Sequence, residues 1–134
     1  MKAHGSFDLR LDNQVLIARL SGAWNEEKSW LYFNKIKEIT QPIIGKPWAA
    51  LLLMNDWELG TPETEQVTKI LAEWLSTHGL SKVAEIHDPS LLRQRHIERI
   101  VRENPGEIER CHFTEEKEAI AWLASNGFPL AHPI

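Results

Sequence analysis

The chain has 134 residues, of which 43% are hydrophobic and 25% are charged, and its net charge is −4 at pH 7. This size is typical of one domain, and the composition is that of a folded chain rather than a disordered one. The balance of 19 acidic against 15 basic residues argues against a nucleic-acid partner, because that contact needs clustered positive charge. We therefore expect one domain over residues 1–134.

Cysteine usage and the distribution of apolar residues bear on the cellular compartment. Cys111 is the chain's one cysteine, so no disulfide can form within the chain, which fits a reducing compartment. The first residues lack the apolar run of a signal peptide. No apolar stretch reaches the length of about 18 residues that is typical of a membrane-spanning helix. These features predict a cytoplasmic protein without a membrane span.

The N-terminal part of the chain alternates apolar and polar residues. Phe7, Leu9 and Leu11 precede a polar turn at residues 12–14, and a second β-rich segment follows over residues 15–20. Two such segments around a short polar turn predict a β-hairpin.

A helix and a buried strand are predicted next. Asn25 is a favourable N-cap residue for the helix. Its apolar residues recur three positions apart and predict a buried stripe: Trp30, Phe33, Ile36 and Ile39. The apolar run from Trp48 to Met54 is typical of a strand covered on both faces, and Asn55-Asp56 is the turn predicted to end it.

The second half of the chain alternates helices and strands. Thr61-Pro62 combines a capping hydroxyl with a proline at the first helical position, and the helix is predicted to end near Gly79. A strand at 83–86, a helix from Asp88 to about Arg102, a strand at 108–113 and a helix after Thr114 follow. The order ββαβαβαβα requires crossovers, so we expect an α/β fold with a mixed, largely parallel sheet of about five strands covered by helices. Residues 5–128 are expected to be structured, and 129–134 to form a loosely held tail.

Two of the predicted strands end in the segments Leu20-Ser-Gly-Ala-Trp24 and Leu51-Leu-Leu-Met-Asn-Asp-Trp57. With the opening hairpin, these segments resemble the SpoIIAA-like family of small stand-alone bacterial proteins, which is related to the STAS domain of anti-sigma-factor antagonists. The resemblance covers about residues 5–128. It implies the STAS fold and a regulatory or binding function without catalysis.

The resemblance also directs attention to the loop after the second of these segments. In regulatory members of the wider STAS group this loop holds a phosphorylatable serine, usually after an aspartate. Here Asp56 is in place, residues 55–62 contain no serine, and Thr61 is the only hydroxyl. Thr61 is therefore the candidate phosphoacceptor. Its alternative role is helix capping, and the acidic residues around it would repel a phosphate group.

Trp24 and Trp57 follow predicted strands at the edge of the sheet where α/β proteins bind ligands. Two tryptophans there can line an apolar pocket, with Asp56 and Glu58 at its rim. The alternative is that both rings cover the core beneath the loops. The hypothesis is a small-molecule pocket formed by Trp24, Asp56, Trp57 and Glu58.

A basic segment offers a second candidate surface. On a helix, Arg95, Arg99 and Arg102 would share one face, with His96 beside it. This face could bind an anion or an acidic protein partner, and the acidic stretch 56–65 makes a homodimer one version of that hypothesis. The alternative is a solvated helix face whose arginines pair with neighbouring glutamates.

Metal and cysteine chemistry are not expected. The histidines at 4, 78, 87, 96, 112 and 132 form no close pair of the kind that chelation on one helix or loop requires, so neither a metal site nor a cofactor is predicted. Cys111 and His112 are neighbours on a predicted strand and point to opposite faces, so they cannot act as a thiol–imidazole pair. The sequence therefore favours a non-catalytic regulatory or binding protein. The alternative is an enzyme in which the Asp56 and Glu58 carboxylates act on a small-molecule substrate.

Overall fold

The computed structural model describes residues 5–57, 62–89, 100–102 and 108–132. Within this part of the chain the strands are β1 (Ser6–Asp12), β2 (Val15–Gly22), β3 (Trp48–Trp57), β4 (Leu80–Ile86), β5 (Ile100–Arg102) and β6 (Glu109–Phe113). The helices with complete bounds are α1 (Glu26–Ile39), α2 (Pro62–Thr77) and α4 (Glu116–Ser125). The strands form one sheet in the order β1-β2-β3-β4-β6-β5.

The sheet is mixed, as predicted. β1 and β2 form the expected antiparallel hairpin, with Asn13 at a positive φ of 52° in its turn. β2, β3, β4 and β6 pair in parallel. Along the chain α1 lies between β2 and β3, and α2 lies between β3 and β4, as parallel neighbours require. The three-residue β5 pairs antiparallel with β6.

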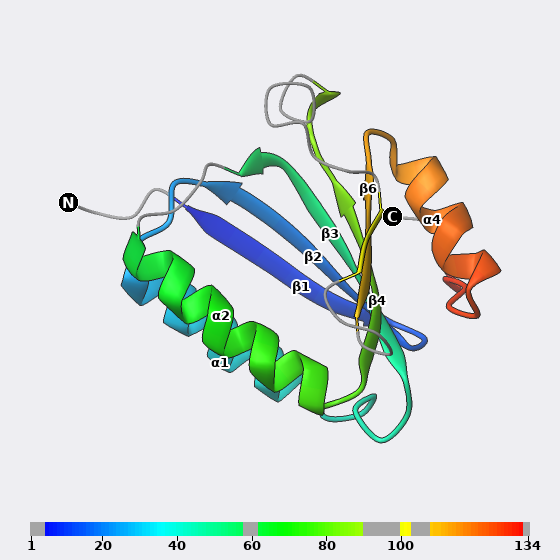
Figure 1. The fold of residues 1–134 in the computed structure, drawn as a ribbon, viewed down its shortest axis with the longest axis horizontal. Helices are drawn as coiled ribbons and strands as arrows, with labels where there is room; N and C mark the ends of the chain where they lie inside the picture. Colours follow the sequence, from blue (N-terminus) through cyan, green and yellow to red (C-terminus); the bar gives the residue numbers. More distant parts are fainter. Residues whose placement is uncertain (1–4, 58–61, 90–99, 103–107, 133–134) are drawn as a thin grey trace.

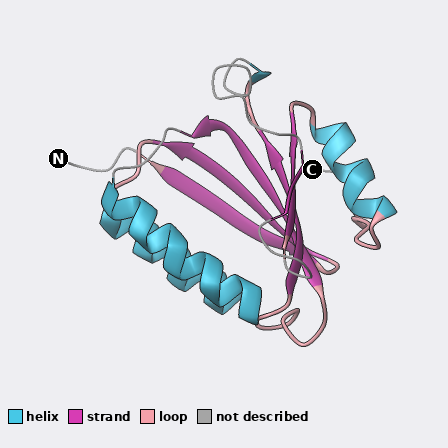
Figure 2. Ribbon diagram, in the orientation of Figure 1, coloured by secondary structure: helices cyan, strands magenta, loops and turns pink. Residues whose placement is uncertain are grey.

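Helices cover both faces of this sheet. α1 and α2 lie together on one face, and α4 lies on the other (Figures 1 and 2). Each face has its own apolar cluster, one packed under α1 and α2 and the other under α4. We call these two sides the α1/α2 face and the α4 face.

Side chains of β4 and β6 alternate between the two faces with the period of two that a strand imposes. On β4, Val83 packs in the cluster under α1 and α2, and Ala84 and Ile86 pack in the cluster under α4. On β6, Cys111 and Phe113 pack on the α4 face. Glu85, Arg110 and His112 therefore lie on the α1/α2 face.

Two predicted boundaries are wrong. Asn55 and Asp56 belong to β3 rather than to a turn, because β3 continues to pair with β2 beyond the apolar run. The register shifts by one residue there, so that Asp56 pairs with Ser21. The helix predicted to reach Arg102 does not, since residues 100–102 form β5 and pair with β6.

The expectation of a loosely held tail is also wrong for residues 129–132. The Asp12 carboxylate accepts hydrogen bonds from the backbone N–H groups of Ala131 and His132, at 2.7 and 3.0 Å. Leu130 and the preceding Phe128 pack against the apolar cluster of the α4 face. The tail thus closes over that face and is held at the β1–β2 turn.

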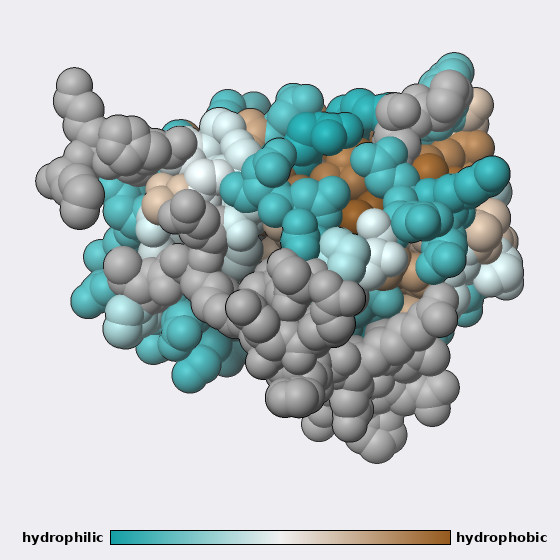
Figure 3. Space-filling model, turned by 90° about the horizontal axis from the view of Figure 1, so that it is seen from above, coloured by the Kyte–Doolittle hydropathy of each residue, from teal (hydrophilic) through white to brown (hydrophobic). Residues whose placement is uncertain are grey.

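The described surface is mostly hydrophilic in the view from above, with apolar residues showing between polar ones in the half of the molecule that contains α4 (Figure 3). None of the helices in the described segments combines the length and apolarity needed to cross a bilayer.

Candidate functional site

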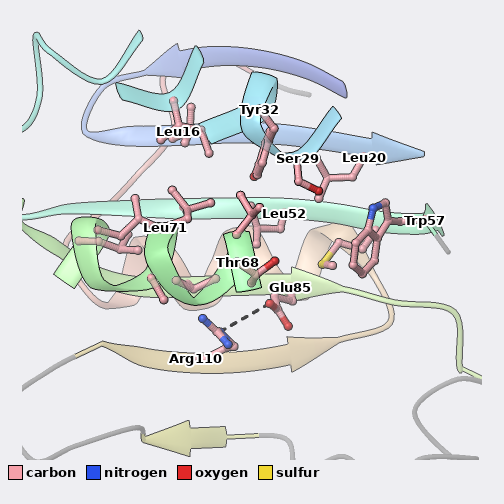
Figure 4. A pocket seen from close by; sticks show the side chains of 18 of the residues that line it. Leu16, Leu20, Ser29, Tyr32, Leu52, Trp57, Thr68, Leu71, Glu85 and Arg110 are labelled. Carbon is pink, nitrogen blue, oxygen red and sulfur yellow. Dashed lines mark ion pairs between the residues drawn. The ribbon is translucent and has the colours of Figure 1, made fainter. Parts of the chain in front are cut away.

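A cavity of about 160 Å³ lies between the sheet and the two helices α1 and α2. Its walls come from β2, β3 and β4, from both helices, and from Arg110 on β6 (Figure 4). Most of the lining is aliphatic or aromatic, and none of it comes from the apolar cluster of the α4 face. The polar lining side chains are Ser29, Thr64, Thr68, Glu85 and Arg110, together with the Tyr32 hydroxyl and the Trp57 indole.

Three aromatic rings form one end of the cavity. Trp24 lies just after β2, and Trp57 is the last residue of β3. Their rings meet edge to face with centroids 6.2 Å apart. Tyr32 on α1 packs edge to face on Trp24 at 5.0 Å. The structure therefore brings together the two tryptophans of the pocket hypothesis, and both line the cavity.

The two indole N–H groups differ. Trp24 Nε1 donates a hydrogen bond to the Ser21 carbonyl oxygen at 3.0 Å. Trp57 Nε1 is buried and has no hydrogen-bond partner among the described residues. A buried N–H without an acceptor is costly, so Trp57 offers a donor to any molecule that enters this end of the cavity.

An ion pair forms part of the cavity wall. The Arg110 Nε atom lies 3.5 Å from Glu85 Oε1 (Figure 4). The charge of the same carboxylate also acts on the Tyr32 hydroxyl. Burial, and to a lesser degree the Glu85 charge, raise the pKa of the Tyr32 phenol far above its ordinary value, so the hydroxyl stays protonated.

Glu85 also belongs to a buried cluster with two histidines. His112 Nδ1 lies 3.1 Å from Glu85 Oε2, and His87 Nε2 lies 3.2 Å from the same oxygen. The parallel register of β4 and β6 pairs Glu85 with His112. His87 stays beside β6 because its backbone N–H donates to the Phe113 carbonyl oxygen at 2.9 Å.

The cluster keeps Glu85 ionised. Burial alone would raise the pKa of its carboxyl group, but His112, His87 and the Arg110 charge lower that pKa to about 2. The glutamate is therefore a buried carboxylate with one oxygen toward Arg110 and the other toward the two imidazoles.

Several predicted site residues lie elsewhere. Asp56 is exposed and does not line the cavity, because it precedes Trp57 on the same strand and points to the opposite face. This corrects the expectation that Asp56 forms the pocket rim. Glu58 and Thr61 lie outside the described residues, so the rim role of Glu58 and the phosphoacceptor role of Thr61 stay predictions.

The predicted basic helix face needs one correction. Arg102 belongs to β5, so it does not continue a helix face with Arg95 and Arg99. Arg95, His96 and Arg99 lie outside the described residues. The anion or partner surface and the homodimer built on it stay predictions.

The glutamate–histidine cluster is what sequence reasoning missed. Glu85 and His87, like Arg110 and His112, are two residues apart, which places each pair on one face of a strand. That alternation was a readable signal. The register that brings the two pairs together depends on residues more than twenty positions apart, so no local pattern contains it.

The fold has a counterpart among solved structures. No family model matches the chain, and no curated protein is significantly similar to it. The chain is similar in structure to an uncharacterized protein of the DUF3478 family from Shewanella loihica PV-4, which has a SpoIIAA-like fold. The TM-score is 0.65 at 15% sequence identity, with 92% of this chain and 96% of that chain covered. This similarity confirms the SpoIIAA-like α/β fold that the resemblance implied.

Proposed function

We propose that the protein is a non-catalytic binding protein that takes a small, mostly apolar molecule into the cavity beneath α1 and α2. The observation that carries this proposal is the cavity itself, which combines an apolar lining with an unpartnered indole N–H at Trp57. Ligand sites commonly have this composition, with a few polar groups that orient a ligand inside an apolar enclosure.

The volume limits the size of the molecule. Cavities of roughly 150 Å³ lined by apolar side chains hold benzene, and the cavity here measures about 160 Å³. A ligand that fits without movement of the helices is therefore about as large as one aromatic ring with a small substituent.

The charges of the lining favour a neutral ligand with a hydrogen-bond acceptor. The two charged groups in the wall, Glu85 and Arg110, are paired with each other. A charged ligand would lose its hydration without gaining a free counter-ion in the described wall, which is unfavourable in an apolar enclosure. An acceptor oxygen, by contrast, can take the hydrogen bond that Trp57 Nε1 lacks.

Calorimetric titration with phenol and benzyl alcohol tests the proposal, since each probe is one ring with one hydroxyl group. We expect one binding site per chain. Ala72→Met should abolish binding, because Ala72 lines the cavity and the longer side chain fills it. Trp57→Ala should weaken binding at least about tenfold, or about 1.4 kcal/mol.

Ala121→Met is the matched control, because Ala121 is an exposed residue of α4 on the other face. It should bind both probes as the wild type does. If Ala72→Met, folded by circular dichroism, binds them as tightly as the wild type, the cavity is not the ligand site and the proposal fails.

The enzyme alternative receives less support. It needs the Asp56 carboxylate to face a bound substrate, and Asp56 is exposed on the side of β3 away from the cavity. The binding function rests on the cavity alone and needs no contribution from Asp56.

A further inference from the structure

We propose that Glu85, His87 and His112 form a binding site for a divalent transition-metal ion, with Zn²⁺ as its representative. Each residue offers one donor atom, and the three donor atoms lie within 4.8 Å of one another. All three residues are buried, with at most 9% of each exposed.

Two of the three donor–donor distances within the cluster match those between the ligands of one metal ion. Bonds of about 2.0–2.1 Å to a tetrahedral Zn²⁺ place neighbouring ligand atoms roughly 3.3 Å apart. Glu85 Oε2 lies 3.1 Å from His112 Nδ1 and 3.2 Å from His87 Nε2. The distances from the carboxylate oxygen to the two imidazole nitrogens are therefore already close to those in a metal site. The third distance, between the two imidazole nitrogens, is within 4.8 Å.

The direction of the His112 ring agrees with this, whereas His87 Nε2 is hydrogen-bonded to the same carboxylate oxygen and would exchange that hydrogen bond for the ion. The His112 Nδ1 atom is close enough to the carboxylate for an ion pair, yet it makes no well-aligned hydrogen bond there. In a metal site the nitrogen lone pair points at the ion, which lies off the line between two ligand atoms. A hydrogen bond would instead require the nitrogen to point at the oxygen itself.

Arg110 plays the supporting part that metal sites usually contain. Groups behind the ligands orient them, and here the guanidinium lies near Oε1 while Oε2 faces the two imidazoles. The carboxylate is thus held with one oxygen available to an ion. Its negative charge also offsets part of the charge that the ion would bring into a buried place.

The donor set indicates the class of metal. Imidazole nitrogens favour Zn²⁺, Fe²⁺ and similar ions, whereas Mg²⁺ and Ca²⁺ prefer all-oxygen sites. Three protein ligands leave at least one coordination position open. Because Glu85 also lines the cavity, the ion would lie at the polar wall of the cavity.

Zn²⁺ binding to the full chain, freed of metal with a chelator that is then removed, tests this inference. The affinity is measured by competition with a chromophoric chelator and without any organic ligand, so the result is independent of the proposed function. We expect one Zn²⁺ per chain. His112→Ala and Glu85→Gln should each weaken binding at least about 100-fold, because each removes a direct ligand.

Co²⁺ provides a second reading of the same site. In a four-coordinate site it should give the intense visible absorption of that geometry, and this absorption should vanish in His112→Ala. His132→Ala is the control, because His132 is exposed and distant from the cluster in sequence. It should leave both Zn²⁺ affinity and the Co²⁺ spectrum unchanged.

Two results would overturn the inference. One is less than one tightly bound Zn²⁺ per wild-type chain, and the other is binding that His112→Ala leaves intact, which would mean adventitious surface sites. If His112→Ala does not fold, His87→Gln replaces it, because His87 follows the end of β4 and a glutamine keeps much of its volume. Retained Zn²⁺ affinity in folded His87→Gln counts equally against the site.

Discussion

The two faces of the sheet are built from the same strands and yet differ in kind. On the α4 face, β4 and β6 present small or apolar side chains, such as Ala84, Ile86 and Phe113, which pack directly under the helix. On the α1/α2 face the same two strands present Glu85, Arg110 and His112, beside a cavity. The α4 face of these two strands is an apolar core, whereas their α1/α2 face carries charged and polar side chains that apolar packing does not require.

The difference separates stability from function. Burying apolar surface stabilises the fold wherever it occurs, whereas a cavity and a buried carboxylate each cost free energy. Because the cavity and the buried carboxylate both lie on the α1/α2 face, we expect binding to occur on that face. Substitutions on the α4 face should therefore change stability alone, whereas substitutions at the cavity on the α1/α2 face should change binding as well.

The largest effect is expected from Leu123→Ala, which removes a fully buried side chain from the α4 face. The lost burial and the new void should lower the free energy of unfolding by about 2–5 kcal/mol. Denaturation by urea measures this. Leu71→Ala is the comparison on the other face, where the side chain already borders a cavity and should cost less. Equal losses at the two positions would contradict the contrast between the faces.

The next effect concerns Tyr32, the chain's one tyrosine, which makes ultraviolet absorbance a direct report on its phenol. Burial and the Glu85 charge raise its pKa. The folded protein should therefore show no phenolate absorbance near pH 10, where an exposed tyrosine ionises. Because the raised pKa belongs to the folded state, stability should fall as the pH rises above about 10. Phenolate that appears near pH 10 before unfolding would refute the buried environment.

A smaller effect of opposite sign is expected from Trp57→Phe. The change removes an indole N–H that is buried without a partner among the described residues. The free protein should gain about 1 kcal/mol of stability, while phenol and benzyl alcohol bind more weakly because their donor is lost. Trp122→Phe, on α4, is the control and should change neither affinity. A loss of stability with unchanged binding would show that the N–H serves the fold.

The smallest effect is expected at the tail. Although burial acts to raise it, the pKa of Asp12 is lowered by hydrogen bonds from the Ala131 and His132 N–H groups. The stability that this carboxylate contributes should be present above its ordinary pKa of about 4 and be lost as the pH falls through its lowered value. Asp12→Asn should cost about 0.5 kcal/mol at neutral pH and flatten the acid side of the stability profile. Asp8→Asn, an exposed neighbour, should do neither.

Local patterns predicted the fold well because its elements have local signals. The hairpin turn, the helix start at Pro62 and the apolar run of β3 each lie within a few residues and were placed correctly. The stripe on α1 was predicted less well. Phe33 and Ile36 are buried, but Trp30 is 37% exposed and Tyr32 is buried in its place. With 3.6 residues per helical turn, two adjacent sets of apolar residues on α1 could face the sheet. Only the packing of the helix against the sheet determines which set is buried.

The candidate site was predicted in part for the same reason. Trp24 and Trp57 were recognised because strand ends are local features. The ion-pair cluster depends on the register between β4 and β6, which is set by packing across the whole sheet. Arg102 shows how a strong periodic pattern can mislead. Its spacing from Arg99 fits a helix, yet it follows Ile100 and Val101, whose β-branched side chains favour a strand.

The reactivity of Cys111 reports how often the α4 side of the molecule opens. Cys111 is the chain's one cysteine, and only 1% of it is exposed, on the side of β6 that α4 covers. A thiol reagent can reach it only after α4 and the sheet part. The rate of its modification therefore follows how often that half of the molecule opens, while the cavity on the opposite side can be loaded or emptied independently.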